Sequence, residues 1–60
     1  MPVVHITLVE GRNNETIEKC IRNVAETISK DLNAPTDSIR VMVNEVPSNR
    51  FSVGQKLKSD

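Results

Sequence analysis

The order of apolar patterns along the chain constrains its fold more than any other feature. Residues 3–9 and 39–46 alternate apolar and polar side chains with a period of two, which is typical of β-strands. Between them, apolar side chains recur every three or four residues and predict one buried helical stripe: Ile17, Cys20, Ile21, Val24, Ala25, Ile28 and Leu32. The pattern predicts a β-α-β unit, and a long helical crossover favours parallel strands with a right-handed connection.

Local signals place the ends of the expected helix. Asn13 or Asn14 can cap its N-terminus, Asn33 can cap its C-terminus, and Pro35 cannot continue it. Three glutamates stand four positions before a basic residue, a spacing worth about 0.2–0.5 kcal/mol per pair. These pairs are Glu15–Lys19, Glu18–Arg22 and Glu26–Lys30.

The C-terminal third predicts a short hairpin. Residues 47–49 have turn chemistry, residues 50–53 can form a short third strand, and Gly54 ends it. Residues 56–60 are polar, and we expect this tail to be frayed. The prediction is therefore an α+β fold, with residues 1–60 forming one domain.

A chain of 60 residues needs support beyond its own core. Chains of this size bury only about 60% of their unfolded surface, and a two-stranded sheet is not stable alone. Cys20 is the only cysteine and His5 the only histidine, so neither an internal disulfide nor a structural metal site is expected. One sheet face, with Val3, Val9 and Met42, would be left open. We therefore expect a homo-oligomer.

Composition argues against several classes of partner. The formal net charge is zero and Phe51 is the only aromatic residue, which argues against nucleic-acid binding. No apolar run approaches the roughly 20 residues of a membrane span. The chain lacks the pattern of a signal peptide, and with one cysteine we expect a cytoplasmic protein.

The chain begins with Met1-Pro2, which suggests a chemical role for the proline. If Met1 is removed, Pro2 becomes a free secondary amine, and such an amine can act as a general base. A proline inside a chain cannot, because its nitrogen is an amide. We predict that Met1 is removed and that the rest of the fold buries the Pro2 amine and surrounds it with cations.

Five short motifs occur in a characteristic order and spacing: Met1-Pro2, Val9-Glu10-Gly11-Arg12, Ala34-Pro35, Ser38-Ile39-Arg40-Val41 and Phe51-Ser52-Val53-Gly54. With these motifs the chain resembles the 4-oxalocrotonate tautomerase family over nearly its full length. The resemblance implies a β-α-β protomer that assembles as a hexamer. It also implies isomerisation, without cofactor or metal, between enol and keto forms of unsaturated 2-hydroxy or 2-oxo dicarboxylates such as 2-hydroxymuconate.

The resemblance also implies roles for individual residues. Pro2 matches the proline that moves the proton, and Arg40 matches an arginine that binds the near carboxylate and the adjacent oxygen. Arg12 matches an arginine that binds the far carboxylate. Phe51 matches an apolar ring against the proline and substrate, and Val9 is counted among the substrate-binding residues. In the family these residues come from neighbouring subunits.

Two alternatives stay open at the level of sequence. A hydratase or dehalogenase on the same scaffold would need carboxylates that activate water, and only Glu10 and Glu45 lie within or beside the strands. A catalytically silent oligomeric binding module is the second alternative.

Gly54-Gln55 replaces a Gly-Gly pair found in many relatives, which leaves the natural substrate open.

Overall fold

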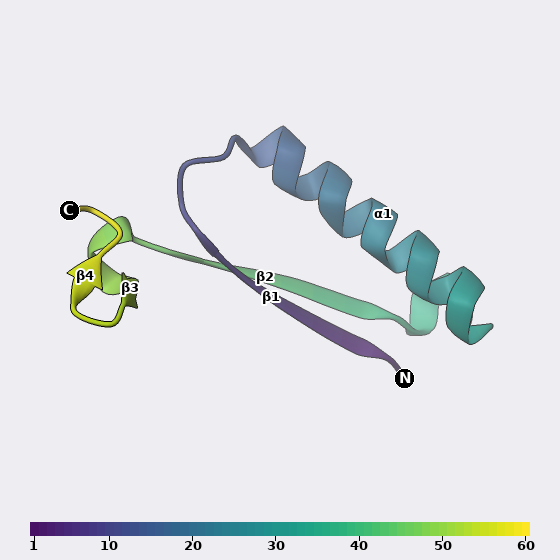
Figure 1. Ribbon diagram of the computed structural model, residues 1–60. Helices are drawn as coiled ribbons and strands as arrows, with labels where there is room; N and C mark the ends of the chain where they lie inside the picture. The colour runs from purple at the N-terminus through teal and green to yellow at the C-terminus, as the bar shows by residue number, and fades with distance from the viewer.

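The elements follow the predicted order, and the computed structural model describes all of residues 1–60. Figure 1 shows the helix along one face of a two-stranded sheet, with a small hairpin projecting beyond it. The elements are β1 (Val3–Val9), α1 (Asn14–Leu32), β2 (Arg40–Val46), β3 (Ser52–Val53) and β4 (Lys56–Leu57), with 3-10 turns at Thr36–Ser38 and Ser48–Arg50. The β-α-β fold with a C-terminal hairpin is confirmed.

β1 and β2 pair in parallel, with Val3 opposite Arg40 and Val9 opposite Val46. Backbone hydrogen bonds extend this pairing at both ends: the Arg40 amide donates to the Pro2 carbonyl at 3.0 Å, and the Glu10 amide donates to the Val46 carbonyl at 2.9 Å. The two strands therefore run side by side over their full length.

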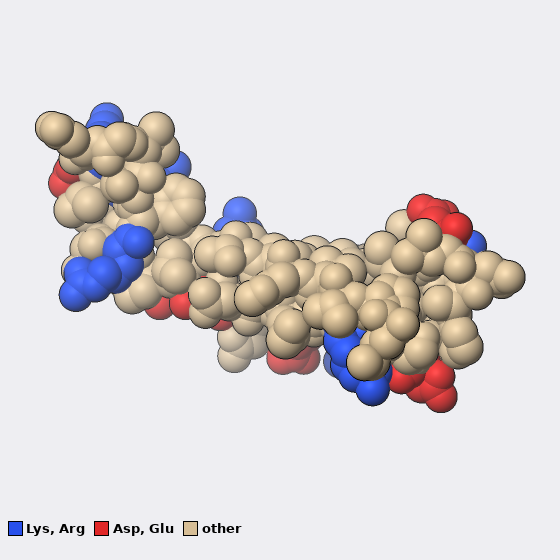
Figure 2. Space-filling model, turned by 90° about the horizontal axis from the view of Figure 1, so that it is seen from below, with Lys and Arg blue, Asp and Glu red and all other residues tan.

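The sheet has one face against α1 and one open face. The helix-facing side carries half-buried apolar residues: Val4, Ile6, Leu8, Val41 and Val43. Ile17 of α1 and Ile39, just before β2, are the two most buried residues, each 8% exposed. The open face carries Val3, His5, Thr7, Arg40, Met42 and Asn44, all exposed. Figure 2 shows this side, where uncharged atoms cover the middle and charged atoms gather at the margins and ends.

Side chains and backbone geometry fix both ends of α1. The Asn13 side-chain oxygen accepts the Thr16 amide at 2.8 Å, which satisfies one free donor of the first turn. Asn33 takes a left-handed conformation, with φ of 53°, and its amide donates to the Ser29 carbonyl. Both asparagine caps were predicted from the sequence. None of the helices combines the length and apolar character needed to cross a membrane.

Two of the three predicted helix ion pairs form, and part of the predicted buried stripe is exposed. Glu18–Arg22 and Glu26–Lys30 lie at 3.8 and 3.1 Å, whereas Glu15 and Lys19 form no ion pair. The prediction that Cys20 and Leu32 are buried was wrong for the single chain, because Cys20 is exposed and Leu32 is 60% exposed. The reason is that two strands about 5 Å apart form a sheet narrower than a helix about 10 Å across, so the sheet cannot cover the whole apolar stripe.

The predicted frayed tail was also wrong. The turn predicted at residues 47–49 is present, but it extends to Arg50, so the third strand begins at Ser52 and not at residue 50. β3 pairs with β4 in antiparallel register. Gly54 has φ of 62°, the positive value that a glycine at the start of a two-residue hairpin turn supplies readily. The Asp60 carboxylate then accepts the Leu57 amide at 3.0 Å, which holds the chain end against the hairpin.

A single copy has very little core. Its radius of gyration is 14.3 Å, whereas a compact chain of this length has about 10 Å. Its accessible surface is 4787 Å², whereas a folded monomer of this mass exposes about 3,900 Å². Only 2 of 60 residues are buried. Such a chain reaches ordinary stability only if other copies cover its exposed apolar faces.

We expect Met42→Lys to disrupt association, because it places a charge at the centre of the open face that the copies must cover. Desolvating an unpaired charge costs several kcal/mol, so analytical ultracentrifugation should show a lower mass and circular dichroism should show loss of helix. Asn49→Lys adds the same charge in an exposed turn and should change neither. A wild-type chain that is monomeric and fully helical would contradict this view.

Candidate active site

Pro2 and Arg40 lie together where the parallel strands begin. Pro2 is half-buried, and its carbonyl accepts the Arg40 amide at 3.0 Å. The Arg40 guanidinium donates to the Asp37 carbonyl at 2.8 Å and forms no ion pair in the protomer. Its charge is therefore available to an anion from outside the chain.

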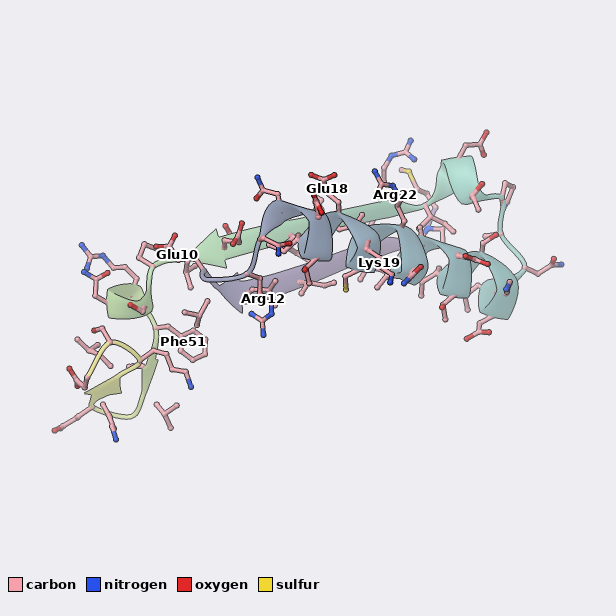
Figure 3. All side chains as sticks on the ribbon, turned by 90° about the horizontal axis from the view of Figure 1, so that it is seen from above. Glu10, Arg12, Glu18, Lys19, Arg22 and Phe51 are labelled. Carbon is pink, nitrogen blue, oxygen red and sulfur yellow. The ribbon has the colours of Figure 1, made fainter.

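Val9, Arg12 and Phe51 lie at the other end of the sheet. Val9 is the half-buried last residue of β1, and Gly11 turns the chain toward α1 with φ of 140°. Arg12 borders an apolar hollow of about 160 Å³ between the first turns of α1 and the sheet. Figure 3 shows Arg12 and the Phe51 side chain near this end. Phe51 is 37% exposed and follows the turn after β2.

The length of β1 separates these two groups of candidates. A parallel strand rises about 3.3 Å per residue, so the seven residues of β1 span about 20 Å. Pro2 precedes this strand, and Arg12 follows it. One chain therefore cannot bring Pro2 and Arg12 to the same small substrate. A site that uses both residues must combine the start of one copy with the far end of another.

Met1 determines whether the Pro2 nitrogen can act as a base. In the full-length chain this nitrogen is an amide and carries no basic lone pair. Met1 is 81% exposed, so its removal would disturb little packing. The carbonyl of Pro2, which anchors the start of β2, would remain in place.

The other polar residues do not form a second constellation near the strands. Glu10 and Glu45 are exposed, and neither side chain has a hydrogen-bond or ion-pair partner in the protomer. His5 lies on the open face beside Met42. No group of three or more His, Cys, Asp or Glu side chains is arranged to hold a metal ion.

Comparison with known proteins identifies one family. A family model described as tautomerase enzyme matches residues 2–60. A probable tautomerase of Lactiplantibacillus plantarum is 43% identical over 60 residues, covering 100% of this chain and 94% of the relative. A 2-hydroxymuconate tautomerase of Pseudomonas putida is 44% identical over 59 residues, covering 98% and 94%.

Solved structures agree. A crystal structure of a 4-oxalocrotonate tautomerase homologue matches with a TM-score of 0.93 at 35% identity, covering 100% of this chain and 95% of that one. A heterohexameric 4-oxalocrotonate tautomerase from Chloroflexus aurantiacus matches with a TM-score of 0.93 at 25% identity, covering 100% and 97%. The chain belongs to the tautomerase family, and it is therefore an isomerase of the keto–enol tautomerase class.

We expect two variants of reduced activity, Pro2→Ala and Arg12→Ala, to recover activity when they are refolded together. If Pro2 and Arg12 of one site come from different copies, random mixing in equal amounts gives about a quarter of the sites both wild-type residues. Ketonisation of an enol substrate measures the recovery. Each variant refolded alone is the control, and a mixture no more active than the average of the two would place both residues in one chain's site.

Proposed function

We propose that this chain is a cofactor-free tautomerase for unsaturated 2-hydroxy or 2-oxo dicarboxylates such as 2-hydroxymuconate. The observation that carries the proposal is the position of Pro2, hydrogen-bonded through its carbonyl to Arg40 at the start of both strands. The name of the Pseudomonas putida relative supports the substrate class. The 43–44% identity over almost the whole chain supports a shared chemistry.

Enol–keto isomerisation needs one group that accepts a proton at oxygen and returns a proton to carbon. In the proposed mechanism Met1 is removed, and the neutral Pro2 amine takes the proton of the 2-hydroxyl group. Electrons move along the conjugated system as the carbonyl forms. The resulting prolyl ammonium then protonates carbon, so the amine returns to its starting state and no other reactant is consumed.

The surroundings must keep the amine neutral near pH 7. An ordinary α-amino group has a pKa of about 7.7–8.0, and a prolyl amine is more basic. Burial beside the Phe51 ring and the positive charges of Arg12 and Arg40 would lower the Pro2 pKa, because each disfavours the ammonium form. The same cations would stabilise the negative charge that develops on the dienolate.

Arg40, Arg12, Phe51 and Val9 would position the substrate. The planar guanidinium of Arg40 can bind the near carboxylate and adjacent oxygen through two hydrogen bonds, and Arg12 of another copy can bind the far carboxylate. Phe51 and Val9 would provide apolar contact to the conjugated chain between the two carboxylates. This geometry would hold the reacting carbon beside the Pro2 nitrogen.

The assembly we propose is a homohexamer. The exposed open face and large surface of the single chain support association, and the heterohexameric relative from Chloroflexus aurantiacus supports this number of subunits. Six chains would give six sites, each joining the Pro2 end of one chain to the Arg12 end of another.

We expect retained Met1 to reduce ketonisation of 2-hydroxymuconate by at least about 100-fold, because the Pro2 nitrogen is then an amide and general acid–base catalysis contributes about 10²–10⁴-fold. Pro2→Ala should cause a smaller loss, because it replaces the secondary amine with a primary amine. The assay follows absorbance of the enol, and intact mass first verifies whether Met1 is absent from each protein. A sample that retains Met1 should be less active than the Met1-free variant. Full activity with Met1 present would contradict the role of the amine.

We expect Arg40→Ala to lower kcat about 10²–10³-fold, the range for removing one group that stabilises transition-state charge. The backbone hydrogen bond from residue 40 to Pro2 does not depend on the side chain, so the oligomer should keep its mass in ultracentrifugation. Arg50→Ala, in the exposed turn after β2, is the matched control. Unchanged kcat in Arg40→Ala would remove this residue from the site.

A further inference from the structure

The C-terminal hairpin brings a lysine directly opposite Phe51. β3 and β4 are antiparallel, with Val53 opposite Lys56. The Lys58 amide donates to the Phe51 carbonyl at 2.8 Å, so the ladder continues to a pair between these two residues. Directly opposed residues of an antiparallel pair lie on the same side, with their Cβ atoms about 4.5–5.5 Å apart. Phe51 and Lys58 therefore share one face of the hairpin.

This face continues toward the turn. Phe51 is extended, with φ of −130° and ψ of 126°, so side chains alternate through it as in the rest of the strand. Val53 and Lys56, two positions along, lie on the same side as Phe51 and Lys58. We call these four residues the hairpin face. Val53, Lys56 and Lys58 border one surface hollow, and Figure 2 shows positively charged atoms grouped at the hairpin end.

The lysines of the hairpin face are not neutralised within the protomer. The two ion pairs of the chain both lie on α1. The nearby Asp60 carboxylate accepts the amide of Leu57 and forms no ion pair with either lysine. Phe51 and Val53 are 37% and 75% exposed, which gives the face an apolar surface beside two free cations. Such a surface suits a flat, conjugated molecule that carries negative charge.

We propose that Lys58 is a specificity-determining residue that acts beside Arg12 and favours substrates whose far end carries a second carboxylate. The inference rests on the proposed function, because it takes Phe51 as part of the tautomerase site. The ammonium of a lysine is a compact charge on a flexible stem, so it can meet a carboxylate without the fixed geometry of an arginine. Lys56 is one pair farther toward the turn and adds to the same positive field.

The experiment compares a doubly charged and a singly charged enol. Values of kcat/KM are measured for 2-hydroxymuconate, with two carboxylates, and phenylenolpyruvate, with one, using wild-type protein, Lys58→Gln and Lys58→Arg. Lys58→Gln should lower kcat/KM for the diacid about two- to fivefold, the effect of one exposed charge pair. The loss should appear mainly in KM, and the monoacid should be unaffected. Lys58→Arg should retain most of the preference.

Ionic strength gives a second readout, because salt screens a contact between exposed charges. Raising the ionic strength should reduce kcat/KM for the diacid less in Lys58→Gln than in the wild type. Lys30→Gln makes the same change in net charge on α1 and should leave the preference intact. If the wild type is active and Lys58→Gln keeps the same preference for the diacid, or loses activity equally on both substrates, the role of Lys58 is overturned and the proposed function is not. A wild type inactive on both enols would overturn this role and the proposed function together.

Discussion

The parallel pairing of β1 with β2 is the constraint on which the rest of this structure depends. It places the starts of both strands together, which joins Pro2 to Arg40 through a backbone hydrogen bond. It also sends the loop with Arg12 and the segment with Phe51 to the opposite end, about 20 Å away at the usual rise per residue. A single protomer therefore holds the two halves of the candidate site at opposite ends of the sheet.

The same pairing explains why stability and chemistry depend on association. One helix can cover only one face of a two-stranded sheet, so the other face and part of the helix remain exposed. Copies that cover these surfaces would supply the missing core and would also bring the two halves of the site together. In the proposed assembly the same association of copies would complete both the core and the site.

Strong periodicity made the main elements and the parallel pairing of β1 with β2 predictable from the sequence, whereas the width of the sheet and the register of the C-terminal hairpin were not. The repeat that includes Ile17 and Ile21 identified α1, and asparagines marked both of its ends. The repeat shows which side of the helix is apolar, but it does not show how wide the sheet beneath the helix is. The exposure of Cys20 was therefore not predicted. Lys58 was predicted to lie in a frayed tail, because the register that places it opposite Phe51 is seen only in the structure. The sequence predicted the candidate residues, but their separation along one chain required the structure.

The most direct measurement is a ¹⁵N NMR titration of the Pro2 amine in the assembled, Met1-free protein, repeated in Arg12→Ala. Within one chain Arg12 lies well beyond the screening length of about 8 Å at physiological salt, so only the Arg12 of another copy can act on Pro2. The account predicts a wild-type pKa below the ordinary 7.7–8.0 of an α-amino group and a higher pKa in Arg12→Ala. An ordinary or raised pKa that does not change when Arg12 is removed would contradict a shared, cation-lined site.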